Sequence, residues 1–326
     1  MKKALLAMSL AMSCMAVGMT AAVAQEPYPS RPITLVVPFP PGGSTDTMGR
    51  VMAKALGDVL EQSVVVENKG GAGTVIGASY VAKAAPDGYT LLVSSGTTFT
   101  VNPAIRANMP YDPVKSFEPL GIVGRTGLVL LANPKVPVHN LKEFVAYVKD
   151  PANKQPPYGS YGTGTTSQFV GEAFLAEAGL QMAHIPYKGS APAMTDLIGG
   201  QIPFTFDTVS AAIPQVKQGT VRAIALSSPK RSKFFPDLPT FVEQGYAGPE
   251  MDTWFMVVAP RGLPAEVKTK LESALRTAVA NPEVQKNLEA QGFEPDYGSA
   301  ADGEALIQKE LPIMRDIAER AHIKLD

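Results

Sequence analysis

Strand-like and helix-like segments alternate along this chain in two successive sets, and this alternation constrains the fold more than any other feature. In the first set, runs rich in β-branched residues alternate with amphipathic runs; the expected strands are 33–37, 63–67 and 89–93, with helices 46–60 and 74–84 between them. The second set repeats the pattern, with strands 158–161, 183–186, 203–206 and 221–226 and helices 165–178, 192–198 and 211–218. A β-α-β-α-β order is typical of a parallel sheet covered by helices. The sequence therefore predicts two α/β units.

The last third of the chain is mostly helical, with helices expected at 264–280, 282–291 and 303–321. Segment 121–137 leads into the second unit, and a return crossing near 251–260 would let the helical tail pack on the first unit. Two crossings form a hinge with a cleft between two lobes, and ligand sites in open α/β sheets lie at the carboxyl ends of strands. The predicted lobes are 25–125 with 253–326, and 126–252.

Residues 1–24 have the pattern of a secretory signal peptide. Lys2 and Lys3 precede a run of apolar and small residues, and Ala22-Val23-Ala24 is an A-x-A pattern, so cleavage is expected after Ala24. The only cysteine, Cys14, leaves with this segment, although a lipoprotein signal at Cys14 stays open as an alternative. A mature chain without cysteine suits an oxidising export compartment, and the expected location is the periplasm.

The composition and the motifs disfavour several classes of function. A formal charge of −1, without any block of like charges, argues against a nucleic-acid partner. The sequence contains no G-x-S-x-G elbow, no phosphate-binding loop, and no H-E-x-x-H or C-x-x-C motif. The three histidines are far apart in sequence. We therefore expect no metal, no cofactor and no catalytic residue.

Two loops carry most of the functional signal. Segment 38–46, with Gly42-Gly43-Ser44-Thr45, joins an expected strand to an expected helix, and segment 161–167, with Gly162-Thr163-Gly164-Thr165, does the same in the second unit. The free N–H groups and the partial positive charge of a helix N-terminus suit a carboxylate. Either loop alone would be explained by ordinary helix capping. One loop in each lobe, both without Arg or Lys, predicts an anion held by amides and hydroxyls.

Three further side chains have open roles. Asp207 ends an expected strand and could pair with a ligand ammonium, accept from a ligand hydroxyl, or cap the next helix. Phe39 could pack on the carbon skeleton of a ligand or fill the hinge. Trp254, the only tryptophan, lies in the expected return crossing and is interpreted as a packing residue.

Several short motifs in a fixed order resemble the extracytoplasmic solute receptors of the tripartite tricarboxylate transporter family, also called Bug receptors. The resemblance extends from Tyr28 to the C-terminus. The motifs that carry it are Tyr28-Pro29-Ser30-Arg31-Pro32-Ile33, Pro38-Phe39 with Gly42-Gly43 and Asp46, Pro86-Asp87-Gly88-Tyr89-Thr90, Pro110-Tyr111-Asp112-Pro113, Ile185-Pro186-Tyr187-Lys188-Gly189, Phe206-Asp207, and Pro236-Asp237-Leu238-Pro239-Thr240 with Glu243 and Gly245.

The resemblance implies an α/β, two-lobed periplasmic binding protein of type II-like, Venus-flytrap architecture, in which each lobe is a mainly parallel sheet flanked by helices. It also implies a small carboxylate ligand. Carried over by position, the ligand-binding residues would be Phe39, Gly42, Gly43, Ser44, Ser94 and Ser95 from lobe 1, and Gly164, Thr165, Thr166, Ser167 and Asp207 from lobe 2. Two positions depart from the family pattern: Thr74 stands where Gly is often found, and Phe255-Met256 follows Trp254 where Gly is common.

The predicted function is capture of an organic carboxylate without chemistry, followed by presentation to the membrane permease subunits of a tripartite tricarboxylate transporter. The protein is expected to be a monomer. An orphan receptor that signals to a sensor kinase is one alternative, and a receptor of an ATP-driven importer is another. The alternative from a different class is a hydrolase with Ser44 or Ser167 as nucleophile, which the missing elbow disfavours. Several carboxylic acids would satisfy the same amides, so the sequence leaves the ligand open.

Overall fold

The computed structural model describes residues 27–246 and 250–325. The contacts divide the chain into a segment up to Ser30 and a body of residues 31–326, and the fold below is that of the body. The predicted signal peptide and Cys14 lie outside the described residues.

Lobe 1 is built on a five-stranded sheet with the order β2-β1-β3-β9-β4. Its strands are β1 (Ile33–Val37), β2 (Val64–Asn68), β3 (Thr90–Ser95), β9 (Asp252–Pro260) and the first part of β4 (Phe117–Ala132). Strand β1 pairs in parallel with β2 and β3, whereas β9 is antiparallel to both β3 and β4. Strand β1 is almost wholly buried because helices cover both of its faces, which explains its continuous apolar run.

Lobe 2 repeats this strand order. Its sheet has the order β6-β5-β7-β4, with β8 pairing β4 as well, and its strands are β5 (Tyr158–Ser160), β6 (His184–Pro186), β7 (Phe204–Thr208), β8 (Arg222–Leu226) and the last part of β4. Strand β5 is parallel to β6 and β7, and β4 is antiparallel to β7 and β8. In both lobes the first strand therefore lies between the second and the third.

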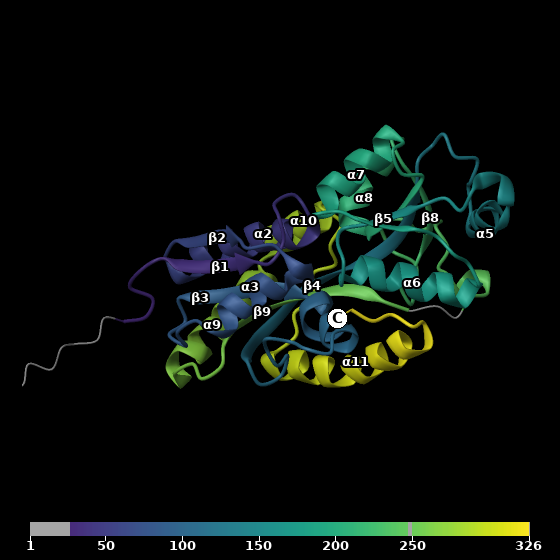
Figure 1. Ribbon diagram of the computed structural model, residues 1–326. Helices are drawn as coiled ribbons and strands as arrows, with labels where there is room; N and C mark the ends of the chain where they lie inside the picture. The colour runs from purple at the N-terminus through teal and green to yellow at the C-terminus, as the bar shows by residue number, and fades with distance from the viewer. Residues whose placement is uncertain (1–26, 247–249, 326) are drawn as a thin grey trace, which may run out of the picture. The chain divides into compact units, whose positions relative to one another are not determined.

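The two lobes are joined through β4 and β9, as Figure 1 shows. Residues 117–127 of β4 pair with β9, and residues 128–132 pair with β7 and β8. The predicted two-lobed α/β architecture is confirmed. The predicted parallel strands are present, and the crossing strands add antiparallel pairs, so the sheet is mixed. Two irregularities interrupt the β4–β9 register, at Pro119/Gly121 and Ile122/Gly124, within the lobe 1 part of β4.

Helices flank both sheets. In lobe 1 they are α2 (Ser44–Leu60), α3 (Val75–Ala82), α4 (Asn102–Ile105), α9 (Ala265–Ala280), α10 (Pro282–Ala290) and α11 (Ala300–Arg320). In lobe 2 they are α5 (Leu141–Lys149), α6 (Thr166–Ala178), α7 (Ser190–Gly199) and α8 (Val209–Lys217). Single turns occur at η1 (Ala72–Thr74), η3 (Pro151–Asn153) and η4 (Val242–Gln244), and η2 (Thr97–Val101) is a π-helix.

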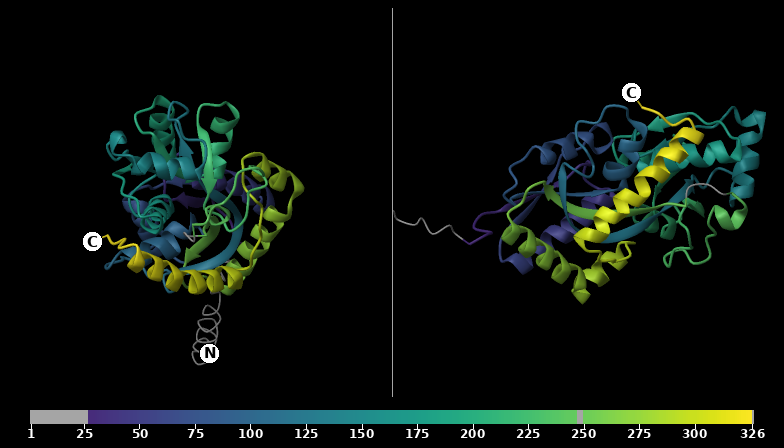
Figure 2. Two further views of the ribbon diagram at one scale, coloured as in Figure 1. Left: turned by 90° about the vertical axis from the view of Figure 1, so that its right-hand side faces the viewer. Right: turned by 90° about the horizontal axis from the view of Figure 1, so that it is seen from below.

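Helix α11 connects the lobes in addition to the crossing strands. It begins at a capping box formed by Ser299 and Asp302. It then contacts β4, η2 and α4 and reaches α6 of lobe 2; Figure 2 shows this long helix in yellow. One hydrophobic cluster accordingly contains Ile105 and Met314 together with Phe169 and Phe206 of lobe 2. The core therefore continues from one lobe into the other.

Candidate ligand-binding site

A small cavity of about 20 Å³ lies between the lobes, with room for about one water molecule. The wall residues are apolar, glycine or hydroxyl-bearing, and none is charged: Phe39, Pro40, Gly43, Ser44, Thr45, Ser95, Tyr161, Gly189, Ser190 and Thr253. Phe39 of lobe 1 packs edge-on against Tyr161 of lobe 2, with 6.0 Å between the ring centroids. The lobes are therefore closed around this cavity.

Helix α2 presents its N-terminus to the cavity. The loop after β1 turns at Gly42, whose φ of 94° favours glycine, and Gly43 is the N-cap without any side-chain capping bond. The first-turn amides of a helix have no intrahelical acceptor. Since Gly43, Ser44 and Thr45 all line the cavity, this end of α2 can offer amides to an anion.

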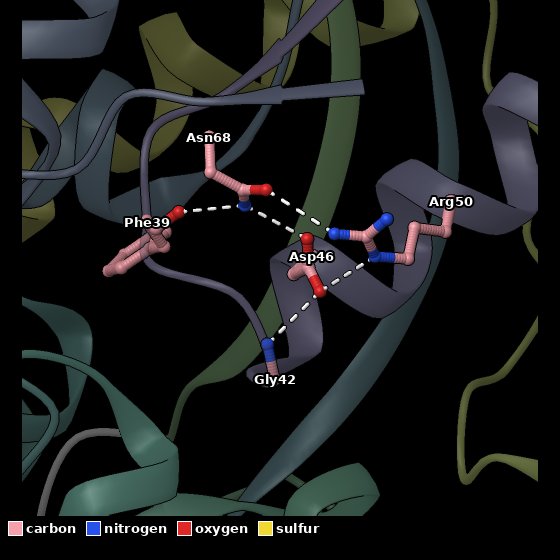
Figure 3. Close-up of polar contacts among 5 residues, drawn as sticks. All are labelled: Phe39, Gly42, Asp46, Arg50 and Asn68. Carbon is pink, nitrogen blue, oxygen red and sulfur yellow. Dashed lines mark hydrogen bonds and ion pairs between the residues drawn. The ribbon is translucent and has the colours of Figure 1, made fainter. Parts of the chain in front are cut away.

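Asp46 fixes the loop in front of α2 (Figure 3). One carboxylate oxygen accepts from the Gly42 amide and from Arg50 Nε, both at 3.0 Å, and the other accepts from Asn68 Nδ2 at 2.9 Å. Asn68 Nδ2 also donates to the Phe39 carbonyl at 3.0 Å. Burial by itself would raise the pKa of Asp46, but the hydrogen bonds from Arg50, Asn68 and Gly42 outweigh it and lower the pKa. A charged Asp46 thus ties β2, α2 and the cavity loop together.

Helix α7 meets α2 from the other lobe. Its N-cap is Gly189, at φ 110°, again without a side-chain capping bond. A methyl group at Gly43 would lie 3.6 Å from Ser190 Cβ, and one at Gly42 would lie 3.5 Å from Ala191 Cβ. The two helix N-termini therefore face each other at van der Waals distance across the cavity wall.

Asp207 lies behind α7 and is not on the wall. Ser190 Oγ donates to one of its oxygens at 2.6 Å, and the Thr208 amide donates to the other at 2.7 Å. Burial raises the pKa of Asp207 to about 6, although the hydrogen bonds from Ser190 and Thr208 oppose the shift. The next helix, α8, is capped by the hydroxyl of Thr208, which accepts from the Ala211 amide, and not by Asp207.

The N-terminus of α6 is occupied by the protein's own groups. The Thr166 amide donates to Thr97 Oγ1 of lobe 1 at 3.1 Å, and the Gly164 amide donates to Gln168 Oε1 at 2.8 Å. The hydroxyls of Thr165 and Ser167 donate to the carbonyls of Gly162 and Phe206, each at 2.6 Å. This loop therefore has few groups left for a ligand in the closed form.

The structure brings part of the predicted set together. Phe39, Gly43, Ser44 and Ser95 lie on the cavity wall. The other predicted residues lie outside the wall: Gly42, Ser94, Gly164, Thr165, Thr166, Ser167 and Asp207. Ser94 is wholly buried and bonds to Thr98 at 2.6 Å.

Other wall residues were missed by the sequence reasoning. Gly189 and Ser190 follow β6 with the same strand–glycine–hydroxyl–helix order as the two loops that were singled out, so the signal was present. Tyr161 is the first residue of the second loop, segment 161–167, but was not among the predicted ligand-binding residues. Thr253 lies at the start of β9 and has no local motif. Its hydroxyl lies beside the Tyr161 phenol but makes no hydrogen bond of good geometry with any described residue, which leaves it available to a ligand.

Two negative findings apply to residues 27–246 and 250–325. Among them, no group of three or more His, Cys, Asp or Glu side chains is arranged to hold a metal ion. No helix within these ranges has the length and apolar character to cross a membrane.

Comparison with known proteins agrees with this architecture. Residues 48–322 match the family model described as the tripartite tricarboxylate transporter family receptor. Protein BugT of Bordetella pertussis is 36% identical over 309 residues, which cover 94% of each chain.

Two similar proteins from Rhodopseudomonas palustris have solved structures with a ligand. Rpa4515 with adipate is 33% identical, with a TM-score of 0.86, covering 91% of this chain and 99% of that one. MatC with bound malate is 30% identical, with a TM-score of 0.84, covering 89% and 99%. The chain therefore belongs to the tripartite tricarboxylate transporter receptor family, a family of periplasmic solute-binding receptors and not of enzymes.

Proposed function

We propose that this protein captures a small organic carboxylate between its lobes and presents it to a membrane transporter. The observation that carries the proposal is the cavity wall, which combines the first-turn residues of α2 and α7 with hydroxyl groups and has no charged side chain. A carboxylate is the ligand group that such a set of donors suits best.

Amides and hydroxyls can supply the required affinity without a fixed cation. Each helix N-terminus acts as about half a positive charge. Hydrogen bonds to a charged group contribute roughly 1.5–3 kcal/mol each, and micromolar binding needs about 8 kcal/mol. Three or four donors from α2, α7 and Thr253 would therefore suffice.

The ligands of the two relatives support the same class. Adipate and malate are both aliphatic dicarboxylates of four to six carbons. A cavity of about 20 Å³ cannot hold either acid, so the lobes must part to admit a ligand and would close less tightly upon it. Contacts made only in the closed form then determine how far the ligand shifts the population towards closure.

The predicted residues that lie outside the wall have supporting roles in this proposal. Asp207 orients Ser190, and segment 164–167 meets lobe 1 directly. The lobes are proposed as 25–125 with 253–326, and 126–252. The proposed mature protein is a periplasmic monomer that begins at Gln25 after signal cleavage, and its closed form docks on the permease.

Calorimetry on residues 25–326 tests the ligand class. We expect saturable one-to-one heat with adipate or malate and none with hexane-1,6-diamine, which has the length of adipate but the opposite charge. Binding of the diamine, or of no dicarboxylate, would contradict the proposal.

Thr253→Val tests the site itself. The Thr253 hydroxyl has no well-formed partner among the described residues, so the variant should unfold at an unchanged or higher temperature while adipate binds about tenfold more weakly. Thr277→Val, on the outer helix α9, is the matched control because its hydroxyl bonds only to Ser273 in the same helix. Unchanged adipate affinity in Thr253→Val would remove Thr253 from the site.

A further inference from the structure

The lobes are closed in this structure, and a pair of threonines from opposite lobes lies where they meet. Thr97 Oγ1 of lobe 1 lies 2.5 Å from Thr166 Oγ1 of lobe 2 and accepts the Thr166 amide at 3.1 Å. Both residues are almost completely buried. One lobe 1 hydroxyl thus occupies the N-terminus of α6, the position where an anion was predicted to bind.

The segment that holds Thr97 is unusual. Thr97 is the first residue of the π-helix η2, and π-helices are rare and frequently occur at functional sites. Thr98 beside it bonds to Ser94 at 2.6 Å and to Thr74 at 2.8 Å. Thr74 itself has φ 85°, a strained conformation for a β-branched residue. Three buried hydroxyls from separate segments therefore fix the position of Thr97.

A second contact lies beside the threonine pair. The backbone of Gly73 approaches lobe 2 so closely that a side chain there would collide with the Thr163 carbonyl oxygen. Asn102 donates to the Gly73 carbonyl and to the Thr97 carbonyl, the latter at 3.1 Å. Gly73 and Thr97 are thereby held on one rigid surface that fits the α6 loop.

We propose that Thr97 is a positioning residue that acts as a latch: through its contact with Thr166 it stabilises the closed form of the protein. Breaking the contact in the closed form leaves the Thr166 amide buried without an acceptor, which is costly, whereas water satisfies that amide when the lobes open. The latch therefore sets the closed fraction before a ligand arrives. Apparent affinity depends on the population of each form, so the affinity part of this inference rests on the proposed function.

Lobe separation in the ligand-free protein tests the latch directly. The mature chain contains no cysteine because Cys14 precedes residue 25, so Lys54→Cys on α2 and Lys149→Cys on α5 can carry spin labels. We expect Thr97→Val to shift the label distances by increasing the open-to-closed ratio about tenfold. Thr97→Ser keeps the hydroxyl and should therefore give the wild-type distribution of label distances.

Thr100→Val is the matched control, since Thr100 is equally buried in the same π-helix but bonds within lobe 1, to the Gly96 carbonyl at 3.0 Å. It should leave the distances unchanged. The double variant Thr97→Val/Thr166→Val should give the same label distances as Thr97→Val, because the two substitutions remove the same contact. Unchanged distances in a folded Thr97→Val protein, or equal shifts in Thr100→Val, would overturn the latch.

Adipate titrations separate this inference from the proposed function. The latch predicts that adipate binding changes in Thr97→Val by about the same factor as the open-to-closed ratio. If the lobes of Thr97→Val open and neither this variant nor the wild type binds adipate, the latch is supported and the ligand class is contradicted. Normal adipate binding with unchanged lobe distances in Thr97→Val would support the ligand class and contradict the latch.

Discussion

Asp207 is a buried carboxyl whose charge the surrounding protein tolerates poorly. Its partners are the hydroxyl of Ser190 and the backbone of Thr208, and no cationic side chain of residues 27–246 and 250–325 forms a hydrogen bond with it. Its pKa rises from 3.8 to about 6, mainly because of burial. At neutral pH the charged form of Asp207 therefore lowers the stability of the fold, while the hydrogen bond from Ser190 to Asp207 keeps the N-terminus of α7 in position.

The sign of the resulting pH dependence follows from the two pKa values. The folded chain binds this proton near pH 6 and the unfolded chain near pH 3.8, so lowering the pH from 7 to 4.5 favours the folded state at this group. The expected gain is about 2 kcal/mol. Denaturant unfolding of the wild type and Asp207→Asn at both pH values measures it. Between pH 7 and pH 4.5, the unfolding free energy of the wild type should rise by this amount relative to that of Asp207→Asn. A difference that stays constant with pH would contradict the assigned pKa.

Residue-level roles were the least predictable from sequence. The glycine–hydroxyl pattern at Gly43 and Ser44 identified wall residues because a helix start after a strand is a local feature. The role of Thr253 depends on β9 reaching the same cavity as Tyr161, and the position of Asp207 depends on Ser190 of α7, which donates to it. Neither leaves a mark in the neighbouring sequence. Thr74 was recognised as a departure from the family pattern, and only the backbone shows why glycine suits that position.

At the scale of elements, most helices and strands of the described body were confirmed within about two residues, because apolar periodicity and turn residues are local signals. The predicted helix 74–84 corresponds to α3, which begins one residue later and ends two residues earlier than predicted. The π-helix η2 and the short α4 were not predicted. Their shape depends on Thr98, Asn102 and α11 packed against them, and such contacts carry no periodic pattern.

Helix α2 offers a test of how the cavity loop is held. Asp46→Asn removes the charge that accepts from Gly42, Arg50 and Asn68. We expect a loss of about 2 kcal/mol in unfolding free energy at pH 7 and, under the proposed function, weaker carboxylate binding, because the loop before Gly43 loosens. The loss should shrink below about pH 4, since a lowered pKa stabilises the fold only while the carboxyl is charged.

Asp58→Asn on the same helix is the control for Asp46→Asn. Asp58 pairs with Lys54 on the exposed face, where both side chains are well solvated, so its replacement should leave stability and binding nearly unchanged. Equal effects of the two substitutions would show that Asp46 contributes only through general charge.

At the scale of the whole body, the two lobes are coupled through shared elements. Strand β4 belongs to both sheets, and α11 packs on both lobes. The hydrophobic cluster around Phe169 includes Ile105 and Met314 from lobe 1. Unfolding one lobe would expose part of the other lobe's core, so the lobes should lose structure together.

Calorimetry should therefore record one unfolding transition for residues 25–326, although two-lobed proteins can depart from two-state behaviour. Leu35→Ala in lobe 1 and Phe144→Ala in lobe 2 each remove a wholly buried side chain and should each cost about 3 kcal/mol. Both should lower the same single transition, and under the proposed function adipate should raise it in each variant, because a ligand specific to the folded body stabilises that body. Two resolved transitions, each displaced by only one of the substitutions, would mean that β4 and α11 do not couple the lobes.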